Sequence, residues 1–116
     1  MNMNGTGFSV LKNFDSSTTG RNPDAGLIQG TDGALYGSTS QGGSSDFGTV
    51  FRLNPDGSGF SVLKGDFDVF TSGGYLHSKL IQGMDGALYG TATWGGSSGY
   101  GTVFKLNTDG SGFSVL

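Results

Sequence analysis

The sequence has no cysteine and no glutamate among its 116 residues. Without cysteine there is no disulfide framework, no thiol nucleophile and no thiolate metal site. All nine acidic residues are aspartate, and aspartate and glycine favour turns and caps, whereas glutamate favours helix. The chain carries 24 glycines and no window with sustained helical spacing of apolar residues. We therefore predict an all-β fold with almost no helix.

Charge and long apolar runs are also scarce. Lysine and arginine number only six, the formal net charge is −3, and the basic residues are scattered along the chain. Because a nucleic-acid surface needs clustered basic side chains, we expect no nucleic-acid partner. No apolar run approaches the roughly 20 residues of a membrane span, so we expect no membrane partner. The start of the chain lacks the basic and apolar regions of a signal peptide, which leaves its localisation unknown.

What the sequence does contain is an internal repeat with an offset of 53 residues. Residues 27–37 return as residues 80–90 with one change, and residues 48–63 return as residues 101–116 with two. A third, partial copy occupies residues 5–12. A period of this size indicates a propeller, a solenoid or an array rather than one ordinary globular core.

The repeat divides the chain into three parts. Residues 1–14 form a leftover outer strand, residues 15–67 the first repeat and residues 68–116 the second. A repeat protein is better counted in such units than in domains, because each unit packs mainly on its neighbours.

Each repeat is expected to form four short strands separated by turns. Asp-Gly pairs recur between them, and glycine readily adopts the positive φ that a tight hairpin requires. The predicted strands are residues 26–29, 34–40, 48–54 and 60–64 in the first repeat and residues 79–82, 87–93, 101–107 and 113–116 in the second. Phe8–Lys12 is predicted to be an additional copy of the fourth strand.

These strands do not alternate cleanly between apolar and polar residues. In Thr49–Leu53 apolar side chains fall on both faces of the strand. A strand covered on both faces needs no alternation, and four-stranded antiparallel sheets covered on both faces are typical of β-propeller blades. A flat sandwich of two sheets is the alternative.

The motif Leu-Ile-Gln-Gly-x-Asp-Gly-Ala-Leu-Tyr-Gly, followed by a Gly/Ser loop and Gly-Thr-Val-Phe-(Arg/Lys)-Leu-Asn-x-Asp-Gly, covers nearly the whole chain twice. It resembles the GloVer tandem repeat of cyanobacterial and verrucomicrobial proteins. The resemblance implies an extracellular or cell-surface setting, often with a sorting signal, and no established activity. The chain has two repeats and shows no sorting signal or leader. The order of strands also looks like the blades of quinoprotein-type propellers.

Two blades would leave one apolar sheet face bare on each side, and such faces mark interaction surfaces. A head-to-tail contact between identical chains covers both, so the partner we expect is the chain itself. A closed homotrimer would have six blades and a closed homotetramer eight, and an open filament is the alternative. The three copies of the fourth strand exceed the two that such a ring needs. We expect one terminal copy to be displaced, to add as a fifth strand or to pair with another molecule.

Catalytic and metal-binding patterns are weak. The single histidine, His77, lies in a connector without a positioned partner, so we expect no catalytic residues and no enzyme activity. The turn Asn54–Gly59 has only part of an EF-hand-like ligand set, which turn chemistry explains without a metal. We expect no metal and no cofactor.

The loops between the second and third strands are the better candidates for ligand binding. They combine small polar residues with aromatic ones, and an aromatic face beside hydroxyl and carboxylate groups suits a shallow sugar site. The candidate residues are Gln41, Asp46 and Phe47 in the first repeat and Trp94, Ser97 and Tyr100 in the second. The alternative is that Phe47 and Tyr100 cap the packing of the blades and that Trp94 is a variable loop tip.

The sequence thus favours a self-assembling, non-catalytic β-propeller module that serves as a scaffold or recognition surface. A lectin-like propeller with a glycan as ligand is the second candidate.

Overall fold

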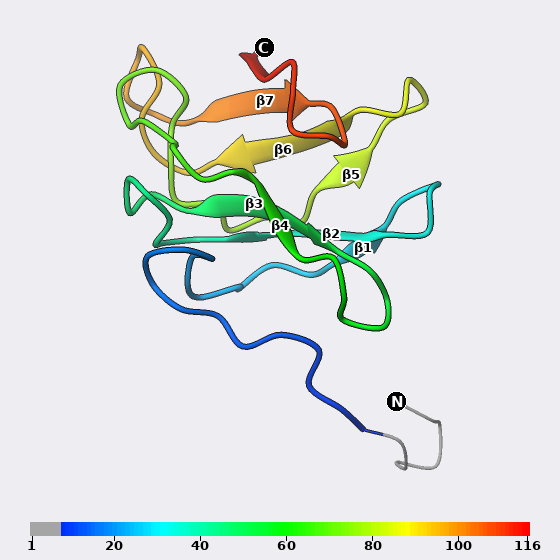
Figure 1. Cartoon of the computed structure of the whole chain (residues 1–116). Coiled ribbons are helices and arrows are strands. Elements are labelled where there is room, and N and C mark those ends of the chain that lie inside the picture. The colour runs from blue at the N-terminus through cyan, green and yellow to red at the C-terminus, as the bar shows by residue number, and fades with distance from the viewer. Residues whose placement is uncertain (1–7) are drawn as a thin grey trace.

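The computed structural model describes residues 8–116 as two four-stranded antiparallel sheets stacked on one another (Figure 1). The strands of sheet 1 are β1 (Ile28–Gln29), β2 (Leu35–Thr39), β3 (Thr49–Leu53) and β4 (Ser61–Lys64), and those of sheet 2 are β5 (Ile81–Gln82), β6 (Leu88–Ala92), β7 (Thr102–Leu106) and β8 (Ser114–Val115). Each sheet follows the sequence order of its strands. The predicted all-β fold and the four strands of each repeat are confirmed.

Asp-Gly turns join the first two strands of each sheet, as predicted. Gly33 and Gly86 adopt φ of 85° and 84°, which side chains other than glycine rarely tolerate. In sheet 1 the carboxylate of Asp32 accepts a hydrogen bond from the backbone amide of Ala34 at 3.0 Å. Aspartate is favoured at this position because its side chain closes the turn locally.

The pairing of β2 with β3 defines two faces of the sheet. Tyr36 lies opposite Arg52, whereas the adjacent Leu35 lies opposite Leu53. Since successive side chains of a strand point to opposite sides, each sheet has two distinct faces. The leucine face comprises Leu27, Leu35, Phe51 and Leu53 in sheet 1 and Leu80, Leu88, Phe104 and Leu106 in sheet 2. The tyrosine face comprises Ile28, Tyr36 and Val50 in sheet 1 and Ile81, Tyr89 and Val103 in sheet 2.

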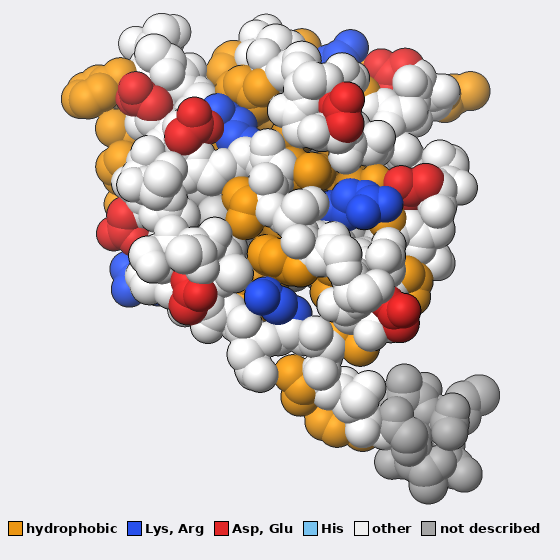
Figure 2. Space-filling view, in the orientation of Figure 1, with side chains coloured by type: hydrophobic (Ala, Val, Ile, Leu, Met, Phe, Trp, Pro, Cys, Tyr) orange, Lys and Arg blue, Asp and Glu red, His pale blue; other side chains and the backbone are white. Residues whose placement is uncertain are grey.

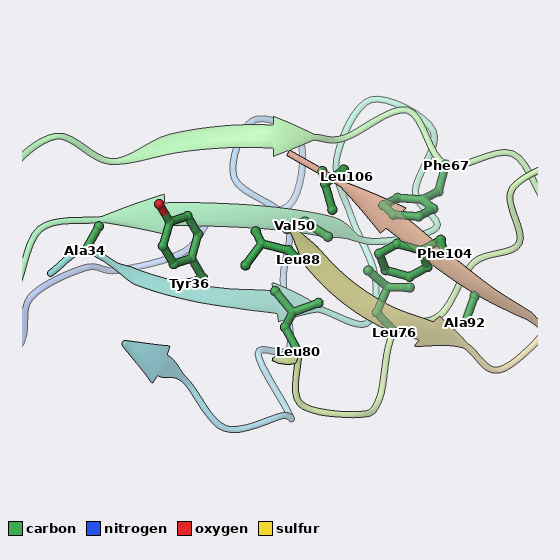
Figure 3. Packing of buried hydrophobic residues seen from close by; sticks show 10 residues of the cluster. All are labelled: Ala34, Tyr36, Val50, Phe67, Leu76, Leu80, Leu88, Ala92, Phe104 and Leu106. Atoms are coloured by element: carbon green, nitrogen blue, oxygen red, sulfur yellow. The ribbon is translucent and has the colours of Figure 1, made fainter. Parts of the chain in front are cut away.

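The two sheets stack front to back. The core lies between the tyrosine face of sheet 1 and the leucine face of sheet 2, as Figure 3 shows. Tyr36 and Val50 from sheet 1, and Leu80, Leu88 and Phe104 from sheet 2, are at most 1% exposed. Consequently, the leucine face of sheet 1 and the tyrosine face of sheet 2 lie on the outside of the stack.

Within the single chain the predicted strand Phe8–Lys12 does not form. It leaves the body on the side of sheet 1 away from sheet 2, and hydrophobic side chains lie along it (Figures 1 and 2). Among residues 8–116 no strand runs alongside it, so its backbone has no ladder to join. Residues 5–7 of the same partial copy lie outside the described residues.

Within the described part of the chain, no helix is long and apolar enough to cross a membrane. Lysine and arginine side chains stand singly on the face shown in Figure 2.

Candidate interaction surfaces

In the loop between β2 and β3 of sheet 1, the candidate residues Asp46 and Gln41 form local polar contacts. The carboxylate of Asp46 accepts a hydrogen bond from the backbone amide of Gly42 at 3.1 Å and lies 3.6 Å from the guanidinium of Arg21. The side-chain oxygen of Gln41 accepts a hydrogen bond from the side-chain amide of Asn22 at 3.1 Å. These contacts shape the loop and bring Arg21 and Asn22 from the preceding connector against it.

Phe47 acts as a packing residue between the two sheets. Its ring meets the ring of Tyr75 edge to face at 5.5 Å between centroids, and its carbonyl accepts a hydrogen bond from the amide of Tyr75 at 2.8 Å. Phe47 is half-buried against the core cluster. Its position fits the packing alternative considered from the sequence.

In the loop of sheet 2, Trp94 and Ser97 line one surface hollow of about 390 Å³. Trp94 is 59% exposed, and Val69 and the exposed Phe70 complete one wall of the hollow. Tyr100 is 92% exposed and is not among the residues that line it. The six candidates therefore form no single site, and only Trp94 and Ser97 come together.

Phe70 was not selected from the sequence. It lies in the connector where the two repeats diverge most, and Ser17 stands at the equivalent position of the first repeat. An aromatic residue that replaces serine in a polar connector is the signal that could have identified it.

Aspartate and tyrosine form the same pair in both sheets. The hydroxyl of Tyr36 donates to Asp32 at 2.7 Å, and that of Tyr89 donates to Asp85 at 2.6 Å. The hydrogen bond from Tyr36, followed by that from the Ala34 amide, lowers the pKa of Asp32. Burial and then the bond to Asp32 raise the pKa of Tyr36, whereas for Tyr89 the bond to Asp85 is the largest cause of its raised pKa. Both shifts move the pKa values farther from neutral pH, where the aspartates are ionised and the tyrosines protonated.

The only histidine lies beside its counterpart in the other repeat. Nδ1 of His77 is 3.7 Å from the carboxylate of Asp24, and both side chains are about half exposed. Within residues 8–116 no group of three or more histidine, cysteine, aspartate or glutamate side chains is placed to hold a metal ion.

The outer face at each end of the stack carries a shallow apolar hollow. One hollow of about 280 Å³ lies on the leucine face of sheet 1 and is lined by Leu27, Leu35 and Leu53 together with Phe14 and Leu11. A second hollow, of about 290 Å³, lies on the tyrosine face of sheet 2. Its lining includes Ile81, Tyr89 and Val103.

Equivalent residues differ sharply in exposure between these outer faces and the core. Leu27 is 50% exposed while its equivalent Leu80 is 1% exposed. Conversely, Val103 is 50% exposed while Val50 is fully buried. The outer faces thus leave Leu27, Ile81 and Val103 at least half exposed. On the leucine face of sheet 1, Phe51 and Leu53 are already covered, at 2% and 4% exposed.

Repeated four-stranded antiparallel units without helix make this an all-β tandem-repeat protein. The chain belongs to the Gloeobacter/Verrucomicrobia repeat family, which it matches over residues 1–116. The resemblance drawn from the sequence motif is thereby confirmed. A comparison with curated proteins finds no match.

Proposed function

We propose that this chain is a non-catalytic module that self-assembles head to tail into a longer stack of β-blades and acts as a scaffold or recognition surface. The front-to-back packing of the two sheets carries the proposal. A sandwich that is complete in itself needs only one apolar face per sheet, whereas here both faces of the repeated unit are apolar. The leucine face of one copy can therefore receive the tyrosine face of the next in the manner seen between sheets 1 and 2.

The exposed side chains support this contact. In this contact Leu27 and Val103 would become as buried as their equivalents Leu80 and Val50. Burial of each half-exposed apolar side chain contributes on the order of 1 kcal/mol. Tyr100, the equivalent of Phe47, stands free at the same end of sheet 2 as Phe47 stands in sheet 1. In the proposed stack Tyr100 would lie against Asn22 of the next copy, the residue equivalent to the Tyr75 that Phe47 contacts.

We propose closure by rotation into a β-propeller, with three chains forming six blades or four chains forming eight. A heterologous contact that closes produces a ring, and one that does not close produces a filament. The twist between the stacked sheets, repeated at each contact, would decide which of the two forms.

The titratable groups support a non-catalytic role. General acid–base catalysis needs a pKa close to the working pH. In the Asp–Tyr pairs the pKa values move away from neutral pH, because the pKa of Asp32 is lowered and that of Tyr36 is raised. Their hydrogen bonds close the hairpin turns, which is a structural task.

Two variants that each block one outer face test the proposal. Leu27→Lys places a charge on the leucine face of sheet 1, and Val103→Lys places one on the tyrosine face of sheet 2. We expect the parent protein to have a multiple of the chain mass by light scattering coupled to size exclusion, and each variant alone to be a single chain. A mixture of the two should form a dimer, because each variant keeps the face that the other has lost.

This mixing result is specific to a head-to-tail contact. If the parent protein were a single chain, the assembly proposal would fail. If one variant alone still dimerised and the mixture formed nothing new, the contact would be isologous and the proposed stacking wrong.

A lectin-like role is a second candidate, favoured by the hollow at Trp94. An exposed indole beside the hydroxyl of Ser97 offers stacking and hydrogen bonding to a sugar. A glycan array tests it with the parent protein, with Trp94→Ala and with Phe8→Ala, whose aromatic ring is exposed elsewhere. Binding that Trp94→Ala abolishes and Phe8→Ala retains would support this site, and no binding by the parent would exclude it.

A further inference from the structure

The N-terminal segment docks on sheet 1 in the way that the end of β4 docks on sheet 2. The ring of Phe14 packs edge-on against Phe51, with centroids 5.1 Å apart and planes at 62°. The ring of Phe67 packs against Phe104 at 5.5 Å and 63°. Since Phe14 and Phe67 occupy equivalent positions of the repeat, both segments use the same docking contact.

Lys12 and Lys64 also make equivalent contacts with the two sheets. The ammonium of Lys12 lies 4.4 Å from the centroid of the Phe60 ring, and the ammonium of Lys64 lies 4.2 Å from that of Phe113. Both distances are within the range of a cation–π contact. Lys12 therefore stands against sheet 1 as Lys64, the last residue of β4, stands against sheet 2.

The main chain of the two segments also lies in equivalent positions relative to the two sheets. A methyl group built on Gly57 would come within 3.0 Å of the carbonyl oxygen of Leu11, and one built on Gly110 within 2.8 Å of that of Leu63. Such close approaches of main chain to main chain fix the path of both segments. Leu11, Lys12 and Phe14 thus take the positions relative to sheet 1 that Leu63, Lys64 and Phe67 take relative to sheet 2, although one residue separates the lysine from the phenylalanine in the first segment and two in the second.

This position defines where the preceding residues belong. Upstream of its docked end, β4 is the fourth strand of sheet 1 and pairs with β3. Residues 8–12 are accordingly placed to pair with the third strand of a sheet that stacks on the leucine face of sheet 1. In the proposed head-to-tail assembly, on which this inference rests, that strand is β7 of a second copy.

Within its own copy, the edge of β7 pairs with β8, and the amide of Leu116 adds a hydrogen bond to the carbonyl of Val103 at 2.8 Å. β8 has two strand residues, Ser114 and Val115, both exposed, whereas β4 has four strand residues on the equivalent edge. A fifth strand would lie about 4.8 Å farther out. The contacts of Lys12 and Phe14 with sheet 1 instead hold residues 8–12 at the distance of the fourth strand, next to β7 of the second copy.

We infer that residues 8–12 form the fourth strand of sheet 2 in a second copy of the chain, replacing the β8 of that copy on the edge of β7. The exposed side chains of Phe8 and Val10, at 72% and 63%, then gain the neighbours that Phe60 and Val62 have in sheet 1. Each contact between copies combines sheet stacking with a shared strand, so the exchange ties neighbouring blades together.

Engineered cysteine pairs test the exchange cleanly, because the chain has no cysteine of its own. Arg52 and Ser61 are paired residues of β3 and β4, and the equivalent pair of β7 and β8 is Lys105 and Ser114. The exchange pairs Lys105 with Ser9 of another copy instead. Paired residues of antiparallel strands lie about 4.5–5.5 Å apart at Cα, within the reach of a disulfide.

Three double variants are oxidised in parallel and run on a non-reducing denaturing gel. Arg52→Cys with Ser61→Cys is the positive control and closes within one chain. Ser9→Cys with Lys105→Cys is expected to give covalent multimers. Lys105→Cys with Ser114→Cys is expected to close roughly tenfold less, the ratio expected from one to two additional backbone hydrogen bonds in the exchanged strand.

The outcomes separate this inference from the proposed function. Full closure of the Lys105/Ser114 pair with no multimers from the Ser9/Lys105 pair, in a protein whose light-scattering mass is still a multiple of the chain, would overturn the exchange alone. A single-chain mass for the parent protein would overturn the exchange and the stacking together.

Discussion

Sheet 1 and sheet 2 are built from nearly the same residues and yet turn opposite faces toward each other. Sheet 1 buries Tyr36 and Val50 and leaves Leu27 half exposed, whereas sheet 2 buries Leu80 and leaves Val103 half exposed. The difference comes only from which side of each sheet has a neighbour. Burial here is a property of position in the stack, and the comparison predicts that it becomes equal once another copy covers the outer faces.

The largest expected effect is the difference in unfolding free energy lost on alanine substitution of Leu80 and of Leu27. Leu80→Ala removes a buried side chain from the core and should cost about 2–5 kcal/mol of unfolding free energy. Leu27→Ala should cost less than about 1 kcal/mol in the dilute single chain, since half of its side chain is already in water. Urea denaturation at low concentration measures both values.

The same pair measured at concentrations that favour assembly provides the control. There the penalty of Leu27→Ala should approach that of Leu80→Ala, because the proposed stacking would bury both residues. Equal penalties at high dilution, where no second copy covers Leu27, would contradict the difference between the two sheets.

A smaller effect is expected for the glycines beneath these leucines. A methyl group on Gly90 would lie 2.7 Å from Leu80, and one on Gly37 would lie 2.6 Å from Leu27. Overpacking a core costs about 1–3 kcal/mol. Gly90→Ala should cost more, because the buried Leu80 and Phe104 both lie 2.7 Å from the added methyl group. At Gly37 the buried Phe51 lies equally close, but Leu27 can turn toward solvent, so Gly37→Ala should cost less.

Thermal unfolding of both variants by circular dichroism measures this difference. A larger loss for Gly37→Ala than for Gly90→Ala would show that the outer leucine face is packed as rigidly as the core.

The strands and turns could be predicted from the sequence because their causes are local. Asp-Gly pairs mark the hairpins, and the apolar segments between them mark strands, so β2, β3, β6 and β7 fall where the pattern places them. The predictions that failed or stayed open depend on neighbours. Phe8–Lys12 has the residues of a strand and lacks a strand beside it, and no local pattern distinguishes Leu27 from Leu80.

The candidate binding residues show the same limit. Trp94 and Ser97 are close in sequence and share a hollow. Phe47 was selected for its aromatic ring, but that ring packs on Tyr75, which lies 28 positions away along the printed sequence. Contacts of this kind arise from the stacking of the sheets, which a single repeat does not encode.

The Asp–Tyr pairs offer a weaker distinction that depends on pH. Because the pKa of Asp32 is lowered in the folded chain, its contribution is present above the ordinary value of 3.8 and is lost as the pH falls through the folded pKa. Tyr36→Phe removes the main cause of that shift. It should cost about 0.5 kcal/mol at neutral pH, a low value because the carboxylate of Asp32 is 43% exposed.

Denaturation curves at pH 7 and pH 2.5 measure this contribution, and the difference between the parent and Tyr36→Phe should shrink at the lower pH. Tyr89→Phe should cost less, because its pair is more exposed to solvent. A penalty for Tyr36→Phe that is unchanged at pH 2.5 would mean that the hydroxyl does not act through the ionised carboxylate.

The last comparison concerns Ser38, whose equivalent in sheet 2 is Thr91. The hydroxyl of Ser38 is the one buried side-chain polar atom without a hydrogen-bond partner among residues 8–116, whereas Thr91 is exposed. Removing an unpaired buried hydroxyl relieves its desolvation cost, so Ser38→Ala should stabilise the chain by up to about 1 kcal/mol. Thr91→Ala should change the unfolding free energy by less than about 0.5 kcal/mol, as is usual for exposed positions. Urea denaturation checks both variants, and a clear loss of stability in Ser38→Ala would reveal a bound partner for that hydroxyl between the sheets.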